Sequence, residues 1–403
     1  MKNKLQRKIL KNGMTILFEK RDLPIVSVAF AVRNGGINES LEEKGISHFI
    51  EHMLYKGTPT RNCKQISESI EKNGGKLNGF TSEEVTAYFC KMPSEKLDIA
   101  LDVLSDIIKN PLFDEKEMEK ERKVIFEEIK LHKDNPQRYI LDEIQNCLYN
   151  GTKGMNLAGT FETMKSINRK KILKKFNEVY KPNNMILCVV GDADFEKLCR
   201  FVDENFSKEK GKVPEQKFNL INKSKIEERE GIDQANLIFA YHSPLANDSL
   251  TYSSIVLSSL MAEGMSSRLF LEIREKKNLA YAVEGDSDIG KKFAYNIIYI
   301  GTTNENVEIV KKLILEEFKK VSKDLDEKEL NQIKNKLIGQ YKISMEDSQT
   351  QMVNLLSSEI HGNAEDFYKF EENISKVKLS DVKELAGKVK EGNYSFFALV
   401  PKN

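Results

Sequence analysis

The chain has 403 residues, of which 63 are Lys or Arg and 62 are Asp or Glu, so its formal net charge is only +1. A protein without a global cationic field has no general attraction to phosphate backbones, which argues against nucleic acid as a partner. Apolar residues make up 40% of the chain and charged residues 31%, as is typical of a packed core under a solvated exterior.

The elements predicted first along the chain are strands. Residues 5–19 alternate polar and apolar side chains around Asn12-Gly13, the dipeptide best suited to a tight hairpin, and residues 25–32 continue as a strand. Helical periodicity follows. The other elements predicted in the first half are helices at Ile46–Tyr55, Lys64–Lys72, Glu95–Lys109, Asp114–His132, Arg138–Tyr149 and Phe195–Phe206, and strands at Lys76–Phe80, Val85–Met92 and Met185–Val190.

The Lys/Glu-rich residues 211–230 have little apolar pattern and are predicted to link two domains, 1–210 and 231–403. The same order of elements then recurs. FDEKEM at 113–118 matches LDEKEL at 325–330 with a constant offset of 212 residues. The sequence therefore predicts an α+β fold with two homologous domains, each an antiparallel-rich sheet packed with helices.

The second half of the chain is predicted to contain the same kinds of elements in the same order. Its predicted elements are a strand at Leu237–Tyr241, a helix at Ser249–Met261, strands up to Ile300 and helices from Val307 onward.

The strongest chemical signal is the segment HFIEH at 48–52, which lies in a predicted helix. At about 100° per residue, His48, Glu51 and His52 share one helix face. Two imidazoles one turn apart can bind one Zn²⁺, and a carboxylate beside them can take a proton from water. The alternative is an amphipathic helix whose two histidines merely lie at its polar edge.

A catalytic zinc site needs a third protein ligand. Glu121 and Glu128 are seven residues apart on one predicted helix, about two turns, so they face the same way, whereas Glu127 points elsewhere. We expect Glu128 to bind the metal and Glu121 to orient an imidazole. His132, one turn past Glu128, is a rival ligand, and a solvated Glu-rich surface is the alternative for the pair.

The HxxEH segment, the ERKVIFEEI helix and the downstream GMSSRLFLEIREKKNLAYAV together resemble the pitrilysin/insulinase family of zinc metallopeptidases over nearly the whole chain. This resemblance implies that His48, His52 and Glu128 bind one Zn²⁺ per chain, that Glu51 is the catalytic base, and that Glu121 supports the site. The length is similar to that of the short two-domain subfamily, the mitochondrial-processing-peptidase-like bacterial peptidases. Their chains pair into a clamshell, so this chain would form half of one.

Two further segments resemble that family. GGKLNGFT at 74–81 is similar to its GG-x-x-NAFT edge strand, which implies that Asn78, Gly79 and Phe80 bind substrate, although Gly79 stands where Ala is usual. Arg274 and Tyr281 match the family's Arg and Tyr that reach the substrate near the metal. A guanidinium and a phenol there would stabilise an oxyanion or hold the peptide. The alternative for residues 74–81 is an ordinary edge strand. The alternative for Arg274 is a charged helix end, and that for Tyr281 is a strand in the core.

The repeat aligns Ile255, Ser258 and Ser259 with the HxxEH residues and Gln340 with Glu128. The second domain is therefore expected to bind no metal and to close a chamber. The sequence predicts a zinc endopeptidase that hydrolyses short or unfolded peptides in that enclosed chamber, as a homodimer with composite active sites. The alternatives are a catalytically silent structural subunit and a dedicated peptide-maturation protease with a partner chain.

The remaining expectations concern location. No apolar run approaches the roughly 20 residues that a membrane-spanning helix needs, and the basic N-terminus leads into no secretion signal. The five cysteines are scattered and form no CxxC pair, which is typical of reduced thiols. The sequence therefore predicts a cytoplasmic protein that does not associate with membranes.

Overall fold

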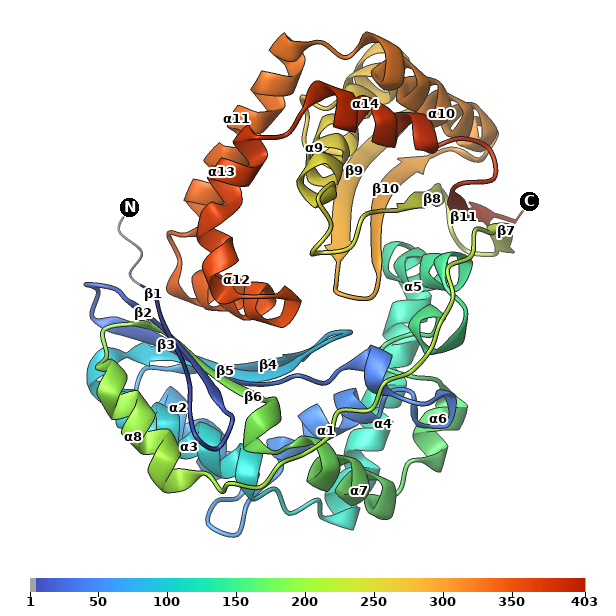
Figure 1. The fold of residues 1–403 in the computed structure, drawn as a ribbon. Helices are drawn as coiled ribbons and strands as arrows, with labels where there is room; N and C mark the ends of the chain where they lie inside the picture. The colour runs from blue at the N-terminus through green and yellow to red at the C-terminus, as the bar shows by residue number, and fades with distance from the viewer. Residues whose placement is uncertain (1–4, 403) are drawn as a thin grey trace. The chain divides into compact units, whose positions relative to one another are not determined.

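The computed structural model describes residues 5–402, which form two compact units (Figure 1). The first unit comprises residues up to 130 together with 155–217 and 344–368. The second comprises residues 131–154, 218–343 and those from 369 onward. Each unit contains one sheet with helices packed against it, so the predicted α+β fold is confirmed.

The first unit is built on a six-stranded sheet in the order β1-β2-β6-β3-β5-β4, in which only β2 and β6 pair in parallel. Its strands are β1 (Leu5–Ile9), β2 (Thr15–Lys20), β3 (Ile25–Val32), β4 (Lys76–Thr81), β5 (Thr86–Pro93) and β6 (Met185–Gly191). Its helices are α1 (Ile46–Leu54), α2 (Cys63–Glu71), α3 (Leu97–Lys109), α4 (Glu115–Asp134), α6 (Phe161–Ser166), α7 (Arg169–Val179), α8 (Phe195–Asn205) and α12 (Ser348–His361). Strand β4 therefore lies at an edge of the sheet.

Both faces of this sheet are buried. On β3, Val28 and Phe30 belong to the apolar core that includes α1 and α3, whereas Ala29 and Ala31 point to the opposite face. That opposite face is covered by α12, which lies along β3 and β6 (Figure 1). The apolar side chains of α12 in this second core are Met352, Leu355, Leu356 and Ile360.

Ion pairs as well as apolar contacts hold α12 on the sheet. The buried carboxylate of Glu359 accepts hydrogen bonds from Arg7 Nε at 2.8 Å and from Arg33 Nη2 at 2.8 Å. The hydroxyls of Ser27 and Ser348 lie 2.9 Å apart. Helix α12 is thus part of the first unit although it lies far outside the predicted domain 1–210, which is a difference from the contiguous division expected from sequence.

The second unit is built on a five-stranded sheet in the order β7-β11-β8-β10-β9. Its strands are β7 (Ser224–Arg229), β8 (Ala235–His242), β9 (Ala280–Ile289), β10 (Ala294–Thr302) and β11 (Ser395–Pro401). Its helices are α5 (Pro136–Leu148), α9 (Thr251–Ala262), the π-helical segment Phe270–Lys276, α10 (Val307–Asp324), α11 (Glu327–Ser344), α13 (Phe370–Ser375) and α14 (Leu379–Lys388). Strand β7 lies inside the predicted linker 211–230. Its backbone pairs in parallel with β11, so this segment is part of the second sheet.

The two sheets have the same topology. Apart from β1, the first runs β2-β6-β3-β5-β4 and the second β7-β11-β8-β10-β9, and in each only the first pair is parallel. The exchange of helices is also repeated, since α5 packs on β8 and β11 of the second sheet just as α12 packs on the first. Each sheet is therefore completed by a helix from the other half of the chain.

No helix among residues 5–402 has both the length and the apolar character needed to cross a bilayer. The five cysteines are all free thiols, and only Cys63 is exposed.

Candidate metal centre

The helix that carries the HxxEH residues is fixed at its first turn by a buried carboxylate. Helix α1 follows Gly45, whose φ of 94° is a left-handed conformation that favours glycine. Glu39 accepts hydrogen bonds from the backbone N–H of Gly45 at 2.9 Å and of Ser47 at 2.7 Å. Burial raises the pKa of Glu39, although the buried Lys44 ammonium 3.9 Å away opposes the shift. This cap determines where α1 begins.

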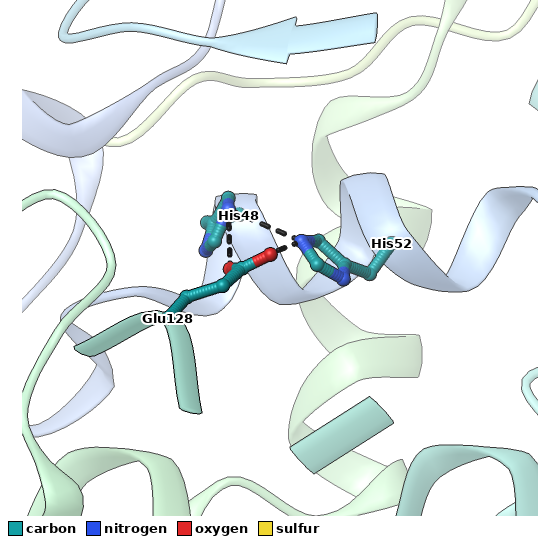
Figure 2. Close-up of side chains that lie close together, drawn as sticks. All are labelled: His48, His52 and Glu128. Carbon is teal, nitrogen blue, oxygen red and sulfur yellow. Dashed lines mark hydrogen bonds and ion pairs between the residues drawn. The ribbon is translucent and has the colours of Figure 1, made fainter. Parts of the chain in front are cut away.

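The side chains of His48, His52 and Glu128 converge, as Figure 2 shows. The Nε2 atoms of the two histidines are 3.2 Å apart. Glu128 Oε2 lies 3.7 Å from His48 Nε2 and 3.6 Å from His52 Nε2. One ligand atom from each residue lies within 4.8 Å of the other two. The side chain of Glu128 is 38% exposed, whereas that of His52 is 16% exposed. The group is therefore half-buried and open on the Glu128 side.

These donor atoms suit a divalent metal. Two imidazole nitrogens with facing lone pairs repel each other unless a proton or a cation lies between them. Two histidines and one carboxylate form a ligand set that zinc uses in catalytic sites, where three protein groups bind it. The three side chains are thus suited to holding Zn²⁺, and they come from only two helices, α1 and α4.

Glu121 lies behind His52 in the same arrangement. Its Oε2 is 3.1 Å from His52 Nδ1, and its Oε1 is 2.7 Å from Lys56 Nζ. A carboxylate at Nδ1 holds the proton on that nitrogen, so Nε2 presents its lone pair toward Glu128 and His48. Lys56 balances the buried charge of Glu121.

Helix α4 is held against α1 by Arg122, the residue after Glu121. Its guanidinium lies 5.2 Å from the ring centre of Phe49, which is on α1. It also donates to the backbone carbonyls of Met164 and Ile167, the latter at 2.9 Å. A shift of α4 along its axis would break these bonds, so they fix the height at which Glu121 and Glu128 meet the histidines.

Glu51 is a residue of α1, one position before His52, and its side chain points toward β4. Its Oε2 accepts a hydrogen bond of 2.8 Å from the Thr81 hydroxyl. Burial raises the pKa of Glu51, and the nearby Glu128 adds to the rise, while Thr81 and His52 oppose it. A carboxylate with a raised pKa is a stronger base, which suits proton transfer. Thr81 lies in the GGKLNGFT segment, and the two-residue period of a strand places it on the same side as Gly79.

The three predicted substrate-binding residues point to different sides of β4. Asn78 is exposed, and its Oδ1 accepts a hydrogen bond of 2.8 Å from the Gly79 N–H. Phe80 packs on the face that α12 covers, with its ring 6.1 Å from that of Phe89. Gly79 faces α1 instead. The backbone edge of β4 and the side chain of Asn78 are therefore accessible, whereas the Phe80 ring packs against the apolar core.

The absence of a side chain at Gly79 leaves room for Tyr55. A Cβ added at Gly79 would lie 2.4 Å from the Tyr55 hydroxyl oxygen, 3.0 Å from the Ala87 carbonyl and 3.1 Å from Glu51 Oε1. The Tyr55 hydroxyl is buried, and among the described residues no acceptor lies within hydrogen-bonding distance of it. Sequence reasoning did not single out Tyr55, because its relation to Gly79 depends on one interatomic distance.

Arg274 and Tyr281 lie in the second unit. The Arg274 guanidinium is 4.8 Å from the ring centre of Phe270, within the π-helical segment, and Tyr281 is an exposed residue of β9. Both residues line two adjoining cavities of about 440 and 560 Å³. His132, the rival ligand, contacts Asp142 instead, and Glu127 pairs with Lys130.

Among its described residues, the second unit has no counterpart of the candidate ligand group. Residues 5–402 contain one group of His, Cys, Asp or Glu side chains placed to hold a metal, that of His48, His52 and Glu128. Helix α9 carries the buried Ser258 and Ser259 where the repeat expects ligands.

Comparisons with known proteins match both halves of the chain. Residues 15–160 match the model of the family described as insulinase (peptidase family M16), and residues 166–337 match the peptidase M16 inactive domain. An uncharacterized zinc protease of Rickettsia felis is 32% identical, with 96% of each chain covered. The uncharacterized zinc protease YmxG of Bacillus subtilis is 31% identical, with 86% of each covered.

Solved structures share the fold over the whole chain. A protease from Helicobacter pylori superposes with a TM-score of 0.92 at 21% identity, covering 99% of both chains. A putative M16-like peptidase from Alicyclobacillus acidocaldarius has a TM-score of 0.87 at 18% identity, covering 99% of this chain and 98% of the other.

Proposed function

Because the chain belongs to the insulinase (M16) family of metallopeptidases, we propose that it is a zinc-dependent endopeptidase with one metal site per chain. The observation that carries this proposal is the meeting of His48, His52 and Glu128 within 4.8 Å, with Glu51 beside them. A helix with exposed histidines and no function would not require a carboxylate from a second helix at the same point.

His48 Nε2, His52 Nε2 and Glu128 would hold the metal. When bound, Zn²⁺ acts as a Lewis acid and lowers the pKa of water to about 7. Glu51 accepts the proton of the attacking water at Oε1, because its Oε2 is held by the Thr81 hydroxyl. It then passes this proton to the amine that leaves the cleaved bond.

The test separates metal binding from proton transfer. The purified protein should contain about one zinc per chain by atomic absorption. Glu51→Gln should keep this zinc and lose nearly all peptidase activity, whereas Glu128→Gln should lose both. Glu127→Gln is the matched control, because Glu127 lies on the same helix and pairs with Lys130 2.7 Å away. A metal-free wild-type protein would instead support the silent structural subunit.

For the substrate, we propose short or unfolded peptides that add a strand to the free edge of β4. Strand addition uses backbone hydrogen bonds and so demands an extended chain rather than a given side chain. The Gly79 N–H donates to Asn78 Oδ1, so the Asn78 side chain would have to turn away before a substrate could accept that hydrogen bond. A flexible peptide of a few dozen residues should be cut, and the same sequence inside a stable folded domain should survive. Comparable rates for both would contradict the enclosed chamber.

We also propose a homodimer in which the metal of one chain acts with Arg274 and Tyr281 of the other. The proposal is supported by the segregation of the metal ligands to one unit and of Arg274 and Tyr281 to the other, in a segment matching the M16 inactive domain. Mixing Glu51→Gln chains with Arg274→Ala/Tyr281→Phe chains should restore roughly a quarter of the activity, since half the dimers are mixed and each has one intact site. No restoration would place all groups of a site in one chain.

A further inference from the structure

Strand β4 presents two of its residues to α1. Gly79 lies directly opposite Tyr88 of β5, and Thr81 follows two residues later. Side chains of opposite residues point to the same face of a sheet, and Tyr88 belongs to the apolar core that includes α1 and α3. The two-residue period of a strand gives Thr81 the same direction. Gly79 and Thr81 therefore both face α1.

The carboxylate of Glu51 lies against both of these positions. Its Oε2 accepts a hydrogen bond of 2.8 Å from the Thr81 hydroxyl. Its Oε1 lies 3.1 Å from the point that a Cβ added at Gly79 would occupy. Threonine has few χ1 rotamers because its side chain is branched at Cβ, so the backbone of β4 sets the place of this hydroxyl. One oxygen of Glu51 is thus fixed by the strand, and the other faces a glycine.

The backbone of the same two residues faces the free edge of β4. In an antiparallel pair, opposite residues alternate between those that exchange backbone hydrogen bonds and those that do not. At the hairpin, the Ser82 N–H donates to the Val85 carbonyl at 2.8 Å, so the next pair, Thr81 with Thr86, is of the second kind. Gly79, two residues earlier, is of the second kind as well, and its N–H donates to a side chain instead. The N–H and C=O groups of Gly79 and Thr81 therefore point away from β5.

We propose that Thr81 is a positioning residue that links the substrate strand to the base. Its outward-facing backbone groups pair with a peptide added to β4, while its hydroxyl holds Glu51 with Oε1 free to take a proton. The spacing between the peptide and the base is then set within one residue of β4. The inference rests on the proposed function, because it assumes that a peptide pairs with β4 and that Glu51 is the base.

The test compares Thr81→Val with Thr81→Ser in zinc-loaded full-length protein, with a flexible fluorogenic peptide as substrate. Valine keeps the shape and the backbone groups of threonine but removes the hydroxyl. Thr81→Val should therefore lower kcat about tenfold or more and change KM less than about twofold, since it misplaces a group that acts in the transition state. Thr81→Ser keeps the donor, so its kcat should stay within about threefold of the wild type.

Thr86→Val is the matched control, because Thr86 lies opposite Thr81 and its hydroxyl donates to the Asn34 backbone carbonyl at 2.9 Å. Thr86 is buried, so the loss of this hydrogen bond should lower the urea midpoint more than Thr81→Val does. The kcat of Thr86→Val should nevertheless stay within about twofold of the wild type. Stability and activity are thus expected to respond in opposite order to the two substitutions.

Two results would overturn the inference while leaving the proposed function intact. One is a kcat for Thr81→Ser as low as that for Thr81→Val, and the other is an equal loss of kcat in Thr81→Val and Thr86→Val. A change in KM alone would do the same, because it would assign Thr81 to peptide binding only. A zinc-replete wild-type protein that cuts no peptide would overturn the proposed function and the inference with it.

Discussion

Replacing Gly79 by alanine tests how closely β4 is fitted against α1. The new methyl group would lie 2.4 Å from the Tyr55 hydroxyl oxygen, about 1 Å closer than ordinary contact, and 3.0 Å from the Ala87 carbonyl. Overpacking of this kind costs about 1–3 kcal/mol. Alanine recovers about 0.5–1 kcal/mol over glycine in a strand, because it restricts the unfolded chain. The net loss of unfolding free energy should therefore lie between about 0 and 2.5 kcal/mol.

The same geometry predicts that Tyr55→Phe rescues Gly79→Ala. The hydroxyl has no acceptor among the described residues, so removing it alone should change stability by less than about 0.5 kcal/mol. In the double variant, the alanine methyl occupies the space that the hydroxyl leaves. The coupling energy between the two changes should then be about 1–3 kcal/mol in favour of the pair.

Urea unfolding of the four proteins measures this coupling. Each should be unfolded both in chelator and with saturating zinc, because a ligand that binds the folded state adds to its apparent stability. The slopes should agree among the four, so that midpoints report stability alone. Losses that simply add in the double variant would refute the reasoning, since they would show that the methyl group and the hydroxyl do not compete for one space.

Two further predictions concern carboxylates. Glu121→Gln should weaken zinc binding about 10- to 100-fold by loosening His52, as measured by competition with a chromophoric chelator, and an unchanged affinity would argue against its orienting role. Glu359→Gln should lower the unfolding free energy at pH 7 by about 3 kcal/mol, because Arg7 and Arg33 lose their counter-charge. Although burial opposes it, the hydrogen bond from Arg7 lowers the pKa of Glu359. Its contribution is therefore present above the usual value of about 4.3 and lost as the pH falls below it, so the gap between variant and wild type should close in acid. A gap in urea midpoints that stays constant with pH would contradict this.

Local periodicity was sufficient to predict most of the fold and the grouping of the candidate ligands. The i, i+4 spacing of His48 and His52 and the seven-residue spacing of Glu121 and Glu128 follow from helix geometry alone, and the structure has all four side chains together. Their roles stay predictions. No helix was predicted between residues 150 and 184, where α6 and α7 occur. Helix α6 is only six residues long, whereas α7 has apolar residues at helical spacing, Ile172, Phe176 and Val179, that the prediction overlooked.

Other features depend on tertiary contacts that periodicity does not contain. The apolar stripe of α12 shows that one side is buried, but not that it packs on β3 and β6, which lie far earlier in the chain. Strand β7 is polar at every position except Ile226, so it has no alternating pattern and is a strand because β11 pairs with it. The link of Tyr55 to Gly79 depends on a distance of a few ångströms between separate elements.

The exchanged helices constrain how this protein can be made. The sheet of the first unit is complete in sequence once β6 has been synthesised, yet its second face waits for α12, which leaves the ribosome much later. Until then, Leu17, Ala29 and Ile186 line an uncovered apolar surface that favours aggregation. A polypeptide ending at residue 210 would keep every candidate metal ligand but leave this surface permanently bare. The first half of the chain is therefore not a separable module, and gene fragments encoding either half alone should yield insoluble protein.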